Sequence, residues 1–178
     1  MKISKKILNK AKQVKLIVSD VDGVLTRGEI IVFNNGEEVK IWNVKDGAAY
    51  NALLKSSEKI KTAWITGRKS IQVKRRAKEM NIDYLVQNCV DKKSALEKIL
   101  KLNNLKPSQV AFVGDDIIDI YAIKISGLSV CPNDASKDVK KGVDYISEFN
   151  GGEGVLRDVV ELILKAKGVW KNVLEKYK

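Results

Sequence analysis

Four short polar segments of this sequence carry the side chains that phosphate chemistry uses. They are Asp20-Val21-Asp22, Thr66-Gly67-Arg68, Lys92 and Gly114-Asp115-Asp116. Four carboxylates brought together repel one another strongly unless a hard divalent cation neutralises them. Mg²⁺ suits this role, because it binds a few carboxylates together with waters and substrate phosphate oxygens. The residue types therefore indicate a magnesium site that accepts a phosphorylated substrate.

Each segment by itself also has a plain structural interpretation. An Asp-x-Asp-Gly sequence is common in polar turns, and Asp115-Asp116 is compatible with the N-cap of a helix. Thr66-Gly67 suits another turn, and Lys92 suits a solvated helix position. However, every segment lies where a predicted strand ends or a predicted helix begins, and the carboxyl ends of parallel strands open into one crevice. Their order along the chain favours one shared site.

The elements that must position these segments are strands that alternate with helices. We expect strands at 15–19, 60–65, 83–86, 110–113, 128–130 and 145–146, and helices at 47–56, 70–81, 92–103, 117–125, 136–141 and 154–167. This alternation predicts an α/β fold, namely a Rossmann-like, doubly wound parallel sheet with helices on both faces. Residues 1–178 are expected to form a single domain, since no repeat, linker or low-complexity segment interrupts the pattern.

A predicted β-hairpin follows the first strand and spans residues 27–46. Residues 29–33 and 38–42 alternate polar and apolar side chains around Asn34-Asn35-Gly36, a strong turn signal. An apolar two-stranded flap is only marginally stable alone, so burial between subunits would explain it better. The same side chains could also cover their own domain. The basic residues 168–178 are expected to form a C-terminal tail.

Histidine content and charge exclude several function classes. The chain has 178 residues and no histidine, which excludes a Ser-His-Asp triad and a histidine-ligated zinc site. Its net charge of +11 is concentrated in residues 1–15 and 165–178, because the 149 residues between them hold 22 bases and 21 acids. Lysines number 28 and arginines 5, whereas phosphate-reading surfaces favour arginine. We therefore expect no nucleic-acid partner.

Cysteine use and hydropathy indicate a cytoplasmic protein. Cys89 and Cys131 lie far apart in sequence, which disfavours a disulfide scaffold and a structural zinc site. No run approaches 18 apolar residues, and residues 1–15 are lysine-rich and amphipathic instead of forming an apolar leader. We expect no membrane partner.

Taken together, the polar segments resemble the motifs of the haloacid dehalogenase-like superfamily. The matching stretches, in the expected order, are Asp20-Val21-Asp22-Gly23-Val24-Leu25-Thr26, Thr66-Gly67, Lys92 and Gly114-Asp115-Asp116-Ile117-Ile118-Asp119. The resemblance implies phosphoryl transfer through a covalent aspartyl-phosphate, with Mg²⁺ as cofactor. A chain without histidine is compatible with this chemistry, since aspartates carry it.

The resemblance also implies a role for each motif. Asp20 corresponds to the nucleophile, and Asp22 to the general acid and base that protonates the leaving alkoxide and later deprotonates water. Thr66 and Lys92 correspond to the groups that hold the phosphoryl oxygens. The implied metal ligands are Asp20, the backbone carbonyl of Asp22, and Asp115.

Two further aspartates of the last motif have open roles. Asp116 is expected to bind the ion through water or to orient Lys92. Asp119 could belong to the motif, cap a helix locally or form a local ion pair. The sequence alone does not choose between these interpretations.

From Val14 to Lys167 the chain resembles a branch without a cap domain, the 3-deoxy-D-manno-octulosonate 8-phosphate phosphatases. Only 43 residues separate Asp22 from Thr66, and 25 separate Thr66 from Lys92, too few for a cap domain. The glycine-rich stretch at 151–157 also resembles that branch. The resemblance implies hydrolysis of this sugar-acid phosphate, a step of lipopolysaccharide biosynthesis, by a homotetramer in which a neighbour's C-terminal tail helps to close the site.

The same branch implies further substrate contacts. Gly67, Arg68 and Arg76 would bind the substrate beside Asp22 and Lys92, with the two arginines facing its carboxylate or phosphate. Arg68 and Arg76 suit ion pairs on a helix face equally well.

Four other functions compete with this interpretation. The nearest is hydrolysis of an N-acylneuraminate or deaminated neuraminate 9-phosphate. A non-catalytic oligomerisation module would not need Asp20, Asp22, Lys92 and Asp115 together. A polynucleotide end phosphatase is disfavoured by the near-neutral central region, and a receiver domain by Thr66, which stands where that domain requires an aspartate.

Overall fold

A six-stranded parallel sheet organises the fold. In the computed structural model, which describes residues 3–178, the strand order is β5-β4-β1-β6-β7-β8. The strands are β1 (Leu16–Ser19), β4 (Lys61–Ile65), β5 (Tyr84–Val86), β6 (Val110–Val113), β7 (Leu128–Cys131) and β8 (Tyr145–Ile146). All neighbouring pairs are parallel. The chain runs outward from β1 in both directions, so the switch point of the sheet lies at the end of β1.

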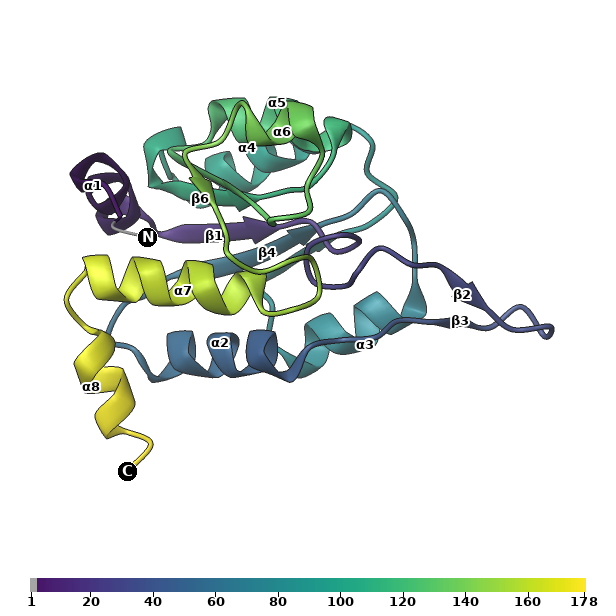
Figure 1. Cartoon of the computed structure of the whole chain (residues 1–178), viewed down its shortest axis with the longest axis horizontal. Helices are drawn as coiled ribbons and strands as arrows, with labels where there is room; N and C mark the ends of the chain where they lie inside the picture. Colours follow the sequence, from purple (N-terminus) through teal and green to yellow (C-terminus); the bar gives the residue numbers. More distant parts are fainter. Residues whose placement is uncertain (1–2) are drawn as a thin grey trace.

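Helices cover both faces of this sheet, as Figure 1 shows. One layer holds α1 (Lys5–Gln13), α2 (Val44–Lys55), α3 (Ile71–Glu79), α7 (Val155–Ala166) and α8 (Trp170–Glu175). The other holds α4 (Lys92–Leu102), α5 (Ile120–Ile125) and α6 (Lys137–Lys140). Single 3₁₀ turns lie at Pro107–Gln109 and Ile117–Asp119. The predicted doubly wound α/β fold is confirmed.

The alternation of side chains along β1 explains why the sheet has two cores. Leu16 and Val18 are buried in the cluster beneath α4 and α5, whereas Ile17 is buried in the cluster beneath α2 and α7. Successive side chains of a strand point to opposite faces, so a strand that is apolar at every position must be covered on both sides. This requirement explains the uninterrupted apolar run at the first strand.

A buried carboxylate joins α2 and α7, which lie in the same helical layer. The residue before α7 is Gly154, which has no side chain to cap the helix. Asp46, in the first turn of α2, supplies the missing acceptor, because its Oδ1 accepts a hydrogen bond from the backbone N–H of Arg157 at 3.1 Å. Burial raises the pKa of Asp46 to about 6, although the backbone N–H groups of Arg157 and Leu156 act to lower it.

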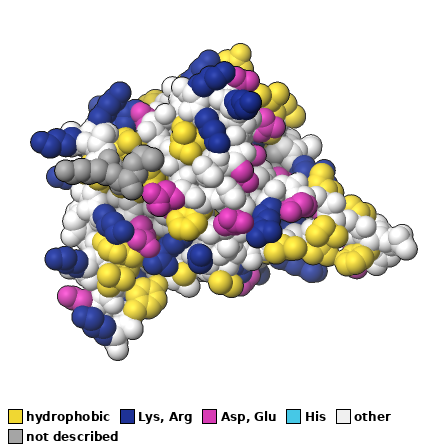
Figure 2. Space-filling model, viewed as in Figure 1, with side chains coloured by type: hydrophobic (Ala, Val, Ile, Leu, Met, Phe, Trp, Pro, Cys, Tyr) yellow, Lys and Arg dark blue, Asp and Glu magenta, His cyan; other side chains and the backbone are white. Residues whose placement is uncertain are grey.

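The predicted hairpin projects from the rest of the molecule (Figure 1). Its strands β2 (Ile31–Val32) and β3 (Glu38–Val39) pair antiparallel and are shorter than expected. Gly36 closes the turn in the left-handed region, with φ of 82°. Figure 2 shows hydrophobic side chains along this arm, and Ile30, Val32 and Phe33 are more than half exposed.

The basic C-terminal tail contains a short helix, α8. Val173 of α8 is buried, and Trp170 lies beneath the charged groups of Arg157 and Lys165. The two lysine-rich ends of the chain meet, since the Lys167 ammonium donates to the Lys12 carbonyl at 3.0 Å. Both ends lie at the end of the molecule opposite the hairpin (Figure 1). No helix within residues 3–178 has the length and apolar character needed to cross a bilayer.

We predict that Asp46→Ala lowers the free energy of unfolding by about 1–3 kcal/mol, because the first turn of α7 loses its buried acceptor. Asp46→Asn keeps an oxygen at this position and should lose less. Chemical denaturation measures both values. Asp138→Ala is the control, since Asp138 is exposed and its ion pair with Lys141 contributes little. Equal losses for Asp46→Ala and Asp138→Ala would contradict the cap.

Candidate active site

The site lies at the carboxyl end of β1, at the switch point of the sheet. Ser19 is paired with Val113 on β6, and the next N–H, that of Asp20, donates to the Val113 carbonyl at 2.9 Å. This register places Asp20 beside the Gly114-Asp115 turn that follows β6. The Asp20 side chain is buried, and its Oδ1 accepts a hydrogen bond from the Val21 N–H at 2.7 Å.

A buried lysine reaches the site from the other helical layer. Lys92 is the first residue of α4, and the residue is 1% exposed. Its Nζ lies 2.8 Å from Asp20 Oδ2 and 2.7 Å from Asp119 Oδ1. Burial alone would lower the pKa of Lys92, but the two carboxylates outweigh this effect and raise it. Lys92 is therefore held as a cation between them.

Asp119 both fixes Lys92 and shapes the turn after β6. Its side chain is fully buried, with Oδ1 on Lys92 and Oδ2 accepting from the N–H groups of Asp115 at 3.1 Å and Asp116 at 3.4 Å. Asp116 is exposed, and its carboxylate accepts from the Ile117 N–H at 2.8 Å. The alternative in which Asp116 orients Lys92 is therefore wrong, since Asp119 makes that contact.

The carboxylates fit a divalent cation. Ligand oxygens of Asp20, Asp115 and Asp119 all lie within 4.8 Å of one another. One ammonium faces these three carboxylates, so the fully ionised cluster keeps two negative charges. Burial, followed by repulsion from Asp20 and Asp119, raises the pKa of Asp115 to about 8. Asp115 Oδ1 is buried and has no hydrogen-bond partner within residues 3–178, so it is available to a metal.

A glycine allows the first loop to approach this cluster. Gly23 has a φ of 90°, and a Cβ at this position would lie 2.1 Å from Asp115 Oδ2. Any larger residue would push the loop away from the carboxylate. The donors are hard oxygens, which suit Mg²⁺. Asp115, whose Oδ1 has no partner within residues 3–178, and Asp20 beside it are the side chains that could hold this ion.

Thr66 and Gly67 follow the end of β4, which is the neighbour of β1 in the sheet. Thr66 is buried at the end of β4, and its Oγ1 accepts from the Arg68 N–H at 3.3 Å. A Cβ built on Gly67 would lie 3.9 Å from the Ile118 side chain, in the turn after β6. The structure thus brings together the loops after β1, β4 and β6, as the sequence predicted.

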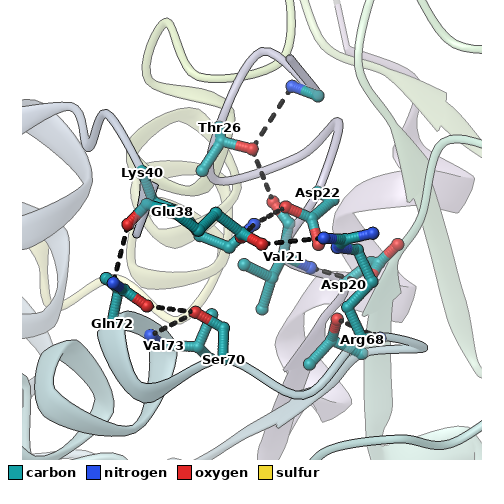
Figure 3. A network of polar contacts seen from close by, with 12 residues as sticks. Asp20, Val21, Asp22, Thr26, Glu38, Lys40, Arg68, Ser70, Gln72 and Val73 are labelled. Atoms are coloured by element: carbon teal, nitrogen blue, oxygen red, sulfur yellow. Dashed lines mark hydrogen bonds and ion pairs between the residues drawn. The ribbon is translucent and has the colours of Figure 1, made fainter. Parts of the chain in front are cut away.

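The hairpin contributes charged side chains that the sequence analysis did not include. Figure 3 shows Lys40 in an ion pair with Asp22 Oδ1 and, at 3.1 Å, with Glu38 Oε1. Glu38 Oε2 in turn lies 2.7 Å from Arg68 Nη2. Glu38 opens β3 and Lys40 directly follows it, so this two-residue spacing directs both side chains to the same side of the hairpin. The spacing of Glu38 and Lys40 is present in the sequence, where these residues form the polar half of the alternation that predicts the hairpin.

The two predicted substrate-binding arginines have different surroundings. Arg68 joins the hairpin network, and its side chain remains 45% exposed. Arg76 pairs with Glu79 on its own helix at 2.7 Å and lines a small cavity with Asp46 and Trp64. Arg76 therefore forms an ion pair on a helix face, one of the two expectations for it. No contact between described residues joins Arg76 to the aspartate cluster.

Comparison with known proteins agrees with this geometry. Residues 33–158 match the family of haloacid dehalogenase-like hydrolases. The 3-deoxy-D-manno-octulosonate 8-phosphate phosphatase of Salmonella typhi is 39% identical over 166 residues, which cover 93% of this chain and 87% of the relative. The enzyme of the same name from Escherichia coli K12 has the same identity and coverage.

Solved structures are similar along nearly the whole chain. The Moraxella catarrhalis phosphatase of that name, in complex with magnesium, phosphate and KDO, has a TM-score of 0.94 and 38% identity, covering 97% of this chain and 98% of that one. The cobalt-bound deoxy-D-mannose-octulosonate 8-phosphate phosphatase of Haemophilus influenzae has a TM-score of 0.85 and 33% identity, covering 89% and 92%.

We predict that metal-free protein loses thermal stability as the pH rises from about 6 to about 8.5, by several degrees. A carboxyl whose pKa is raised to about 8 in the folded state binds more protons folded than unfolded, so rising pH destabilises the fold. The chain has no histidine to titrate in this window. Mg²⁺ should remove the loss, because it neutralises the carboxylates.

Differential scanning fluorimetry with EDTA or Mg²⁺ measures this effect. Asp115→Asn should flatten the pH dependence and abolish the Mg²⁺-induced rise in Tm. Asp138→Asn, at an exposed position on α6, should change neither. A metal-free pH profile of Asp115→Asn as steep as that of the wild type would show that the cluster is not responsible.

Proposed function

Because this chain belongs to the haloacid dehalogenase-like hydrolases, we propose that it is a Mg²⁺-dependent phosphatase of 3-deoxy-D-manno-octulosonate 8-phosphate. The products are the free sugar acid and inorganic phosphate. The observation that carries the proposal is the buried Lys92 ammonium between Asp20 and Asp119, next to the unpartnered oxygen of Asp115. The named activity of the relatives, which are 39% identical over 93% of this chain, supports the substrate.

The reaction proceeds in two displacements at phosphorus. The Asp20 carboxylate attacks, the bond between phosphorus and the sugar oxygen breaks, and Asp22 gives its proton to that oxygen. Asp22 then takes a proton from water, the water oxygen attacks the aspartyl-phosphate, and Asp20 leaves as a carboxylate. Each proton and electron pair is returned, so the enzyme ends as it began.

The surrounding groups stabilise the charge of the transferred phosphoryl group. Lys92 neutralises part of the charge that Asp20 and the phosphate bring together, and the Thr66 hydroxyl donates to a phosphoryl oxygen. Asp20, Asp115 and the backbone carbonyl of Asp22, with Asp116 through water, would hold Mg²⁺, which would supply the positive charge that neutralises the rest. Asp119 keeps Lys92 in place.

The sugar-acid end of the substrate binds on the open side of the site. Arg68 is partly exposed beside Asp22, so its planar guanidinium can bind a carboxylate or phosphate in two-point fashion. Gly67 contributes backbone next to Thr66. A role for Arg76 in substrate binding rests on resemblance to the branch alone. In this structure Arg76 pairs with Glu79 and lines the small cavity beside Asp46.

The working form is a cytoplasmic homotetramer in which hairpins pack together and a neighbour's C-terminal segment helps to close the site. The exposed apolar side chains at Ile30, Val32 and Phe33 support burial of the hairpin in an interface. Both cysteines are free, as expected in a reducing compartment.

The reaction is tested by phosphate release from a panel of esters. We expect the highest kcat/KM for 3-deoxy-D-manno-octulosonate 8-phosphate, with Mg²⁺ required and EDTA inhibitory. A higher kcat/KM for an N-acylneuraminate 9-phosphate or a phosphorylated oligonucleotide would contradict the proposed substrate.

Asp20→Asn should lose at least about 1,000-fold in kcat and form no phosphoenzyme, because the nucleophile is gone. Undiminished turnover by this folded variant would overturn the mechanism.

The assembly is tested by removing one apolar side chain from the hairpin. Phe33→Ser should weaken self-association on the order of tenfold or more, because a buried phenyl ring contributes roughly 1.5–3 kcal/mol. Light scattering after size-exclusion chromatography measures the mass. Ile71→Ser is the matched control, since Ile71 is equally exposed on α3. Identical masses for wild type and Phe33→Ser across a dilution series would argue against the hairpin interface.

A further inference from the structure

The ammonium of Lys40 is buried although it belongs to a projecting hairpin. Its side chain is 1% exposed and contacts Asp22 Oδ1 and Glu38 Oε1. A buried cation needs partners that compensate its lost hydration, and Lys40 has two carboxylates. Its location is therefore fixed by charge, even though the surrounding hairpin is largely exposed.

The ion pair with Lys40 gives the two oxygens of the Asp22 carboxylate different surroundings. Oδ1 is bound to Lys40, whereas Oδ2 is buried without a hydrogen-bond partner within residues 3–178. A general acid and base needs one oxygen free to carry the proton and a side chain held at a fixed rotation. The ion pair provides the second requirement and leaves Oδ2 for the first.

We propose that Lys40 is a positioning residue that holds Asp22 for proton transfer, and that Glu38 holds Lys40. The inference rests on the proposed role of Asp22 as general acid and base. Lys40 acts through Oδ1 of Asp22, and Oδ2 gives the proton to the leaving oxygen and later takes one from water. The hairpin thereby supplies part of the active site of its own chain.

Glu38 is placed to keep Lys40 in position. Its Oε1 binds Lys40, its Oε2 binds Arg68 at 2.7 Å, and its backbone carbonyl accepts from Gln72 Nε2 at 2.6 Å. The Arg68 hydrogen bond, followed by Lys40, holds the pKa of Glu38 below its usual range in spite of partial burial. The Glu38 carboxylate therefore holds both Lys40 and Arg68, and the backbone carbonyl of the same residue ties the hairpin to α3 (Figure 3).

A direct contact between Lys40 and substrate is disfavoured by the same geometry. To reach a substrate anion, the ammonium would have to leave both carboxylates and a buried position. Arg68 is partly exposed and is bound to one carboxylate only through its Nη2, so the rest of its guanidinium can reach a substrate anion. The two cations of the network therefore have different tasks, with Arg68 available to the substrate and Lys40 held on Asp22.

The first test is a double-variant cycle. Lys40→Met should lower kcat about 100-fold with KM changed less than about threefold, because Asp22 loses its fixed orientation. Lys40→Arg should recover part of the loss. In an Asp22→Asn background, Lys40→Met should cost less than about twofold more, since Lys40 acts only through Asp22. A further loss of tenfold or more in that background, or an effect carried by KM, would overturn the proposal.

Leaving-group dependence separates positioning from general damage. With p-nitrophenyl phosphate the first displacement needs no proton donor, so Lys40→Met should show a rapid burst of p-nitrophenol and accumulate phosphoenzyme. With an alkyl phosphate the burst should be absent. Equal slowing of the burst and of steady-state turnover with p-nitrophenyl phosphate would indicate a merely structural role and contradict the proposal.

Neighbouring glutamates provide the matched control. Glu38→Gln should reproduce the kcat loss of Lys40→Met in weaker form, whereas Glu37→Gln, at an exposed position, should behave as wild type. Equal kcat values for Glu38→Gln and Glu37→Gln would remove Glu38 from the proposal.

If wild type hydrolyses p-nitrophenyl phosphate but no sugar-acid phosphate, the substrate proposal fails while the Lys40 test still applies. If Asp22→Asn is fully active, the mechanism itself fails.

Discussion

The ion triad of Asp20, Lys92 and Asp119 is the interaction on which the rest of the site depends. Three charged groups removed from water are stable only when their geometry is nearly ideal, since losing one leaves the others buried and unpaired. That geometry requires β1 beside β6, α4 beginning beneath the carboxyl edge of the sheet, and a tight turn after β6. The sheet register and the start of α4 are therefore parts of the catalytic arrangement.

The triad also explains why the site attracts a cation and a phosphate together. One ammonium, that of Lys92, faces three carboxylates, so two negative charges remain on the ionised cluster of Asp20, Asp115 and Asp119. Burial makes this charge costly and raises the pKa of both Asp20 and Asp115. A divalent cation relieves this repulsion and at the same time offers positive charge to an incoming phosphate. Metal binding and substrate binding are thus favoured by the same imbalance.

The hairpin has two chemically different ends. Its tip exposes apolar side chains, whereas its root carries Glu38 and Lys40, which reach into the site. The role proposed for Asp22 needs a carboxylate that is held in place, and within residues 3–178 Lys40 of this hairpin makes an ion pair with it. The lysine-rich ends of the chain lie at the opposite end of the molecule (Figure 1), so the net charge of +11 is largely remote from the hairpin.

The sequence alone predicted the six strands of the sheet and the helices between them, because local periodicity specifies strands and helices, but it did not predict the helices α1 and α8 at the two ends. It also supplied the motif residues Asp20, Thr66, Lys92 and Asp115, because each adjoins a predicted element. Tertiary structure decided the partners. Lys40 meets Asp22 across 18 residues, Lys92 meets Asp119 across 27, and Asp46 caps a helix across 111. A lysine or aspartate is usually solvated wherever it occurs, so its sequence surroundings do not reveal burial. Only the packing of distant segments removes water from these charges and thereby selects their partners.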